Sequence, residues 1–149
     1  MSTRVPSAGD LAADFLPHAA PFLLLDRIVS IDEQGGRFSK GLTVDDPLVG
    51  PSGVLSPLLV VEAMAQAAGL VLMRREPALR ALGNAVLAAI DRCEVSAPAR
   101  AGDVLMVEIT VTRRYADMAR IHGRAVAGGQ VCATAILTLA FAPVRSPEA

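Results

Sequence analysis

The distribution of apolar residues along the chain separates one long helical segment from several strand-like ones. Between residues 58 and 75 almost every position is apolar, the run is too long for a strand, and Pro77 follows it as a stop signal. A helix without a polar face belongs in the interior of a fold. The sequence therefore predicts a central helix. The small residues expected to let a sheet approach its backbone closely are Ala63, Ala65, Ala67, Ala68 and Gly69.

Shorter segments on both sides of this helix have strand character. Ahead of it, 22–31 and 37–44 flank Gly35-Gly36, which is a hairpin signal, and 10–15 is expected to be a short helix. Behind it, four segments without helical periodicity are divided by turn residues at 98–103, 116–117 and 128–129, and a turn near 83–84 precedes them. These four predicted strands are 85–95, 104–114, 119–127 and 131–141.

Two strands, one long helix and four further strands form an order without βαβ alternation. The predicted fold class is α+β, with one central helix wrapped by an antiparallel sheet of about six strands. A chain of 149 residues has the size of one domain, expected over 1–149 with its core at about 10–142 and a disordered tail at 143–149. Sheet edges and the outer helix surface are left for another subunit, so we expect a dimer.

The composition of the chain mainly excludes classes of function. Hydrophobic residues make up 52% of the chain and aromatic residues 3%, while the net charge of −1 and the scattered basic residues give no footprint for nucleic acid. The apolar stretch 58–73 is interrupted by Glu62 and Gln66, and the N-terminus has no signal pattern, so we expect no membrane span and a cytoplasmic location. Cys93 and Cys132 are expected to be buried free thiols, and neither a metal nor another cofactor is indicated.

Several stretches taken together resemble the hot-dog 3-hydroxyacyl-acyl-carrier-protein dehydratases of fatty acid synthesis. Residues 16–27 read LPHAAPFLLLDR and 62–66 read EAMAQ, and the resemblance extends in the family's order over about residues 15–142. It implies a hot-dog fold, in which a curved antiparallel sheet wraps a long helix, and a dimer with two acyl tunnels along the subunit interface. It also implies acyl carrier protein as a partner and acyl-carrier-protein or coenzyme A thioesters as substrates. The shorter matches are 89–91, 98–103 and 129–132.

The family converts a 3-hydroxyacyl thioester to the trans-2-enoyl thioester. The resemblance implies that a His of one subunit removes the C2 proton, that a helix carboxyl group of the other protonates the departing hydroxyl, and that an amide at the helix start polarises the thioester carbonyl. Glu62 lies at the position of the family's acid, and Gln66 lies one turn later on the same helix face. Gln66, Leu48 and Pro57 are expected to contact the substrate.

Two groups of the family's site are replaced in this chain. Counting back from Glu62 places the family's His at Leu48, and leucine cannot accept a proton. The Gly at the family's helix start is replaced by Pro57, which has no N–H to donate. Ser56 before Pro57 is a favourable cap residue, so this pair suits the folding of the helix while it removes a donor.

The remaining candidates for chemistry are few. His18 belongs to the LPHAAPF element, which the family keeps in addition to its catalytic His, so a structural role near the tunnel mouth is favoured over that of a substitute base. His122 is expected to be exposed or on a sheet face. Ser52 lacks the strand–turn–helix context of a nucleophile, and the pair Asp45-Asp46 is expected to solvate a turn.

The sequence thus predicts a dehydratase-like protein that acts on or binds acyl thioesters in fatty acid or related lipid or polyketide biosynthesis. Dehydration is expected to be impaired or absent when the chain is alone. It is expected to form a homodimer or a higher homo-oligomer, or a heterodimer with a His-containing homologue. The alternatives are an acyl thioesterase using Glu62 and a non-catalytic acyl-binding or partner subunit. A base within reach of Glu62 would favour an enzyme.

Overall fold

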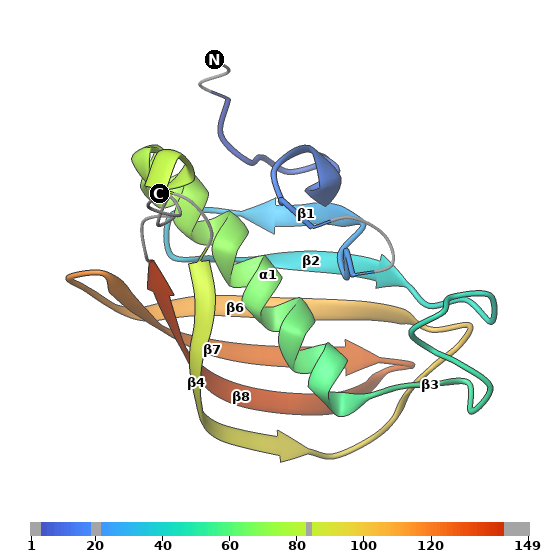
Figure 1. Cartoon of the computed structure of the whole chain (residues 1–149). Helices are drawn as coiled ribbons and strands as arrows, with labels where there is room; N and C mark the ends of the chain where they lie inside the picture. Colours follow the sequence, from blue (N-terminus) through green and yellow to red (C-terminus); the bar gives the residue numbers. More distant parts are fainter. Residues whose placement is uncertain (1–3, 19–21, 83–84, 142–149) are drawn as a thin grey trace, which may run out of the picture.

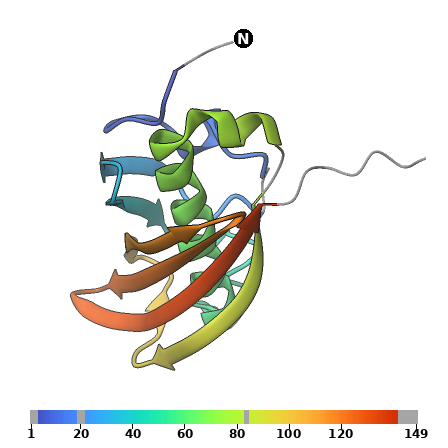
Figure 2. The same cartoon turned by 90° about the vertical axis from the view of Figure 1, so that its left-hand side faces the viewer.

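The computed structural model describes residues 4–18, 22–82 and 85–141, and its main feature is a six-stranded antiparallel sheet curved around the helix α1 (Pro57–Arg75) (Figures 1 and 2). The predicted α+β class, with one central helix and six strands, is confirmed. The predicted turn at 83–84 and the tail 143–149 lie outside the described residues. In spatial order the strands are β1 (Arg27–Ile31), β2 (Gly35–Gly41), β6 (Val104–Tyr115), β7 (Met118–Ala127), β8 (Gln130–Phe141) and β4 (Ala85–Val95).

Shorter elements complete the chain. A two-stranded sheet pairs β3 (Val54–Leu55) with β5 (Ala99–Arg100), next to the start of α1. The short helix expected at 10–15 is the single 3₁₀ turn η1 (Ala12–Asp14), and a second 3₁₀ segment, η2 (Pro77–Leu82), which the sequence did not predict, follows α1. The four strands predicted after the helix are found, and β4 has the predicted bounds.

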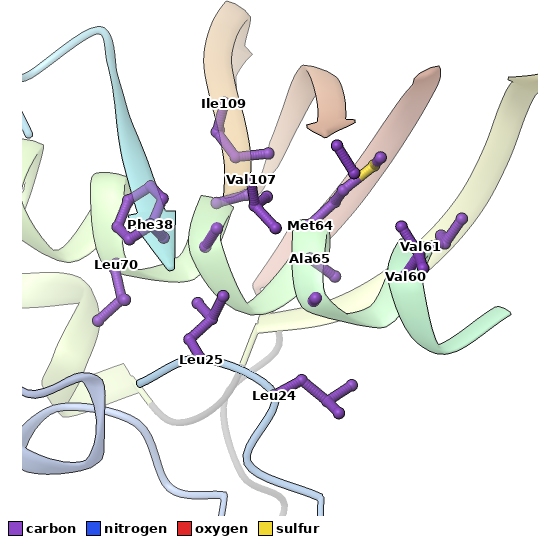
Figure 3. Packing of buried hydrophobic residues seen from close by; sticks show 14 of the residues in the cluster. Leu24, Leu25, Phe38, Val60, Val61, Met64, Ala65, Leu70, Val107 and Ile109 are labelled. Carbon is purple, nitrogen blue, oxygen red and sulfur yellow. The ribbon is translucent and has the colours of Figure 1, made fainter. Parts of the chain in front are cut away.

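The core forms on both sides of α1. Figure 3 shows Phe38, Val107 and Ile109 of the sheet on one side of the helix, and Leu24 and Leu25, from the segment before β1, on the other. All five side chains are buried. The helix is therefore covered on two sides, by the concave face of the sheet and by the segment 22–26, which explains most of its apolar sequence.

The packing of α1 against β7 depends on a glycine of the sheet. A Cβ atom on Gly123 of β7 would lie 2.7 Å from Sδ of Met64 in α1. A Cβ atom on Gly69 of α1 would meet nothing within 4 Å. The expectation that Gly69 lets the sheet approach the helix is therefore wrong, because Gly69 faces open space.

The hairpin between β1 and β2 turns earlier than the sequence predicted. The Asp32 carboxylate accepts the backbone N–H groups of Gln34 at 2.7 Å and Gly35 at 2.9 Å, and these bonds hold the pKa of Asp32 below its ordinary value. Gly35 and Gly36 belong to β2, where a Cβ would lie 2.2 Å and 2.6 Å from neighbouring carbonyl oxygens. The glycine pair is thus required by close backbone contact in the sheet and not by the turn.

The start of α1 combines a correct and an incorrect prediction. The helix begins at Pro57, where proline at the first position suits it. The Ser56 side chain makes no capping hydrogen bond, contrary to expectation. Instead the Ser56 carbonyl accepts the N–H groups of Leu59 at 2.9 Å and Val60 at 3.1 Å.

By length and composition alone, α1 could cross a bilayer. An 18-residue window within it has a mean hydropathy of 1.4, so the prediction that this run is too short and too polar for a span is wrong on that criterion. Of that window, 56% is buried inside the protein. A core helix passes the same test, and the position of α1 under the sheet accounts for its hydropathy.

The two outermost strands differ in how their free edges are covered. Along β1, Gly9 N–H donates to the Ile28 carbonyl at 2.8 Å and Ile28 N–H donates to the Asp10 carbonyl at 2.9 Å. Among the described residues β4 has no such cover on its outer edge. Cys93 lies on β4 and is exposed, so the prediction of a buried thiol is wrong there, whereas Cys132 on β8 is buried; both are free.

Candidate functional site

Glu62 and His18 lie next to each other within one protomer. His18 Nε2 is 3.6 Å from Glu62 Oε1. Glu62 lies on the second turn of α1, and His18 lies in the segment between η1 and β1. The two side chains are 37% and 33% exposed, so a substrate can reach both. The sequence favoured a structural role for His18 at a tunnel mouth, whereas the structure places its imidazole within reach of the predicted acid.

One stripe of α1 is open and not enclosed in the core. Leu58 is largely exposed, and Glu62, Gly69 and Met73 follow on the same side at intervals of one and two turns, each partly exposed. The sequence predicted an interior helix, but in the single protomer the carboxyl group of Glu62 stands in this open stripe. The reason is that the sheet and the segment 22–26 enclose only the other sides of the helix.

Gln66 links the Glu62 carboxylate to the backbone of the segment before β1. Its side chain is almost fully buried; Oε1 accepts the N–H of Leu24 at 2.9 Å, and Nε2 donates to the Phe22 carbonyl at 2.7 Å and to Glu62 Oε1 at 3.3 Å. The backbone partners fix the orientation of the amide, because Leu24 N–H can only donate and the Phe22 carbonyl can only accept. Gln66 can therefore only donate to Glu62.

These bonds also explain a difference from the sequence prediction. The strand expected over 22–31 begins only at Arg27, because the backbone of 22–24 is bonded to the Gln66 side chain and not to a neighbouring strand. The segment that follows His18 is thereby held against α1. The strand-like sequence LLL in this segment supplies core residues, among them Leu24 and Leu25.

A pocket of about 70 Å³ adjoins this pair and has a polar and an apolar end. His18, Glu62 and Gln66 line the polar end. His18 Nδ1 is buried and has no hydrogen-bond partner among the residues that the structure describes. The apolar end is lined by Ala65, Gly69, Met73, Ala85, Leu87 and Leu139, with Pro17 completing the wall. Such a pocket suits an acyl chain whose reactive carbons lie at the polar end.

Leu48 and Pro57, two of the three predicted substrate contacts, do not line this pocket. Pro57 lines a separate apolar pocket of about 240 Å³ with Val60 and Cys132, where burial raises the pKa of the Cys132 thiol. Leu48 is half-buried against the core, and its N–H donates to the Asp46 carboxylate at 3.0 Å. In one protomer only Gln66 of the three lies beside Glu62, and substrate contact by the other two stays a prediction.

Sequence reasoning missed an ion pair beneath the loop that precedes β3. Lys40 Nζ lies 3.3 Å from Asp46 Oδ2, and the two side chains are only 10% and 12% exposed. The expectation that Asp46 merely solvates a turn is therefore wrong. The alternation of residues in β2 could have revealed this ion pair. Phe38, Lys40 and Leu42 lie at alternate positions and therefore face the same side of the strand, which is the interior.

The other candidates have local roles. Ser52 Oγ accepts the N–H of Val54 at 3.2 Å within the loop before β3, as a turn residue does. His122 is exposed on β7, as predicted. Within the described parts of the chain, no group of three or more His, Cys, Asp or Glu residues is arranged to hold a metal ion.

Comparison with known sequences identifies dehydratases. A family model described as ApeP dehydratase, ApeP-like, matches residues 11–147. The 3-hydroxyacyl-[acyl-carrier-protein] dehydratase FabZ of Caldanaerobacter subterraneus subsp. tengcongensis is 34% identical over 132 residues, which cover 85% of this chain and 92% of that protein. The enzyme of the same name from Bacillus pumilus is 33% identical over 135 residues, covering 87% and 92%.

Comparison with solved structures finds the same fold. The dehydratase heterocomplex ApeI:P from Xenorhabdus doucetiae contains a chain with a TM-score of 0.76 at 19% identity, covering 89% of this chain and 91% of that one. A hypothetical thioesterase with coenzyme A from Streptococcus pneumoniae gives a TM-score of 0.64 at 12% identity, covering 80% and 88%. At such identities the likeness concerns the fold alone.

Proposed function

The chain belongs to the hot-dog 3-hydroxyacyl-acyl-carrier-protein dehydratase family, and we propose that it dehydrates 3-hydroxyacyl thioesters with a proton-transfer pair, Glu62 and His18, from a single protomer. The observation that carries this proposal is the 3.6 Å separation of His18 Nε2 and Glu62 Oε1 at the polar end of an otherwise apolar pocket. His18 thereby takes the place of the base that Leu48 cannot provide.

The reaction needs one acid and one base on the two carbons next to the thioester. Neutral His18 accepts the C2 proton at Nε2, the electrons of that C–H bond form the C2–C3 double bond, and the C3–O bond breaks. Glu62 gives its proton to the departing hydroxyl, which leaves as water. The products are the trans-2-enoyl thioester and water.

The same geometry returns the pair to its starting state. After one turnover His18 carries the proton from C2, and Glu62 is a carboxylate. The two groups are 3.6 Å apart, so the proton can pass from Nε2 to the carboxylate with a small movement of either side chain. Gln66 donates to Oε1 and so holds the carboxylate beside His18.

A second subunit is part of the proposal. The uncovered edge of β4 and the open stripe of α1 offer two adjoining surfaces for it. In such a dimer, Pro57 and Leu48 of each subunit approach the substrate bound by the other subunit. Either a second copy or a homologue satisfies this geometry. The ApeI:P protein of Xenorhabdus doucetiae is a dehydratase heterocomplex, which supports the heterodimer. Acyl-carrier-protein thioesters as substrates and a cytoplasmic location complete the proposal.

Turnover of purified protein tests the pair directly. With 3-hydroxyacyl thioesters of acyl carrier protein and of pantetheine, we expect enoyl product from the wild type and a fall of at least about 100-fold in Glu62→Gln and in His18→Asn, since a positioned acid or base contributes this much. His122→Asn, at the chain's other histidine, is the matched control and should retain full activity.

Three outcomes would contradict the proposal. Full activity in His18→Asn would exclude His18 as the base. Release of free acid that depends on Glu62 but not on His18 would establish a thioesterase instead. Activity that appears only after addition of a homologue with the family's His, and that is unchanged in His18→Asn, would make the chain a partner subunit.

A further inference from the structure

We propose that Gly69 sets the length of the acyl chain that the Glu62–His18 pocket accepts and that Met73 closes its far end. This inference rests on the proposed function, because it assigns the apolar end of the same pocket to the substrate's acyl chain. The substrate class is an unbranched acyl chain without polar groups beyond the 3-hydroxyl.

The positions of Glu62, Gly69 and Met73 on α1 define the direction of the pocket. All three line it, and they are separated by seven and four residues, so they lie on one side of the helix. At a rise of about 1.5 Å per residue, Gly69 lies about 10 Å and Met73 about 16 Å beyond Glu62 along the helix axis. An acyl chain with its C3 carbon at Glu62 therefore passes over Gly69 before it reaches Met73.

Gly69 has none of the usual structural reasons to be glycine. Its φ is not positive, and a Cβ atom there would meet nothing within 4 Å, in contrast to 2.7 Å at Gly123 and 2.2 Å at Gly35. Glycine inside a helix is less favourable than alanine. Within the protomer, the missing side chain at position 69 therefore leaves space in the pocket without serving a close backbone contact.

The walls around Gly69 select the kind of chain. Leu87 and Leu139, paired across β4 and β8, face the pocket together with Ala85, and beyond Gln66 no polar side chain lines it. A polar substituent on the chain would lose its water without gaining a hydrogen bond.

Binding of saturated thioesters tests the inference without any reaction. Butanoyl-, octanoyl-, dodecanoyl- and hexadecanoyl-pantetheine are titrated calorimetrically into wild type, Gly69→Val, Met73→Ala and the control Ala13→Val, which changes an exposed residue outside the pocket. We expect Gly69→Val to weaken binding of the longer chains by about fourfold for each methylene excluded, and to leave butanoyl binding unchanged. Met73→Ala should shift the preference to longer chains, and the control should match wild type.

The variant Gly69→Ala controls for the possibility that Gly69→Val fails to fold. It should have a higher melting temperature than wild type and should still disfavour the longest chain. Equal binding of every chain length by all variants, a uniform loss at every length, or no binding to wild type would overturn the inference. Dehydration by wild type with an unchanged length profile in the variants would refute the role of Gly69 alone. A shifted profile without turnover would refute the proposed reaction alone.

Discussion

Gln66 joins two segments that lie more than forty residues apart in the sequence. Its amide accepts the Leu24 N–H, which would otherwise be buried next to α1 without a partner, and it donates to the Phe22 carbonyl and to Glu62. One side chain thus both holds the segment that follows His18 and orients the proposed acid. The spacing of Glu62 and Gln66 in EAMAQ has a structural reason, since four residues place both side chains on one helix face.

Replacement of Gln66 should therefore affect stability as well as activity. We expect Gln66→Leu to lower the free energy of unfolding by about 1–3 kcal/mol, because the buried Leu24 N–H loses its partner, at a cost of about that size. Urea unfolding followed by circular dichroism measures this change. Gln130→Leu, an exposed glutamine of β8, is the matched control. Equal stability of both variants would show that the Gln66 bonds contribute nothing.

The pairing of His18 with Glu62 could not be predicted from the sequence. Forty-four positions separate them, and His18 lies in irregular chain whose path depends on the Gln66 bonds and on the burial of Leu24 and Leu25. Glu62 was found because its neighbours on the helix carry a specific pattern. A tertiary contact that depends on irregular backbone leaves no comparable local pattern.

At the level of elements, β2 and the loop that follows it are joined through a buried charge pair. Lys40 enters the interior from β2, and Asp46 both pairs with it and accepts the N–H of Leu48. The pair therefore ties the loop before β3 to the sheet. In the proposed dimer this loop carries Leu48 toward the partner's substrate, so its position matters for the second half of the site.

Removing one charge of this pair should lower the free energy of unfolding more than removing both. Asp46→Leu leaves the Lys40 ammonium buried without a counter-charge, and we expect a loss of about 3 kcal/mol in the free energy of unfolding. The double variant Lys40→Met/Asp46→Leu should recover most of this loss, because it removes both charges from the interior. Chemical denaturation of the three proteins measures both effects. A double variant as unstable as the single one would show that the charges themselves are not the cause.

The elements were predictable where their patterns are local. The apolar run ending at Arg75, the alternation of β6 and the turn at Gly128-Gly129, where both glycines have positive φ, each determine structure within a few residues. The hairpin turn predicted at Gly35-Gly36 was wrong because a pair of glycines is typical both of a turn and of a close backbone contact. Which of the two applies depends on the neighbouring strand β6, which lies about seventy residues away.

In the whole molecule, some of the exposed apolar residues lie where a second chain is expected. Val86 and Ile90 on β4 are exposed, and so is Leu58 at the start of the open stripe of α1. Cys93 is exposed for the same reason, since it lies on this edge. The sequence predicted a dimer from the need to cover such surfaces, and the structure shows which surfaces of the described chain are uncovered.

Charges placed on this edge should prevent assembly. We expect the double variant Val86→Lys/Ile90→Lys to have the mass of a monomer in light scattering, where wild type has at least that of a dimer, because lysines on an edge strand oppose pairing. Val44→Lys changes an exposed valine of a loop and should leave the mass unchanged. Identical masses for wild type and the β4 variant would locate the interface elsewhere.

The segment at residues 9–11, hydrogen-bonded along β1, has a consequence for how far assembly can go. A sheet with two open edges can add chains at both and grow into a filament. Here one end of the sheet is already closed by the chain's own backbone through Gly9, Asp10 and the bridge between Leu11 and Arg27. Two chains joined along β4 would leave only closed ends among the described residues. Residues 9–11 therefore prevent strand pairing at β1, so the sheet can be extended by another chain only at β4.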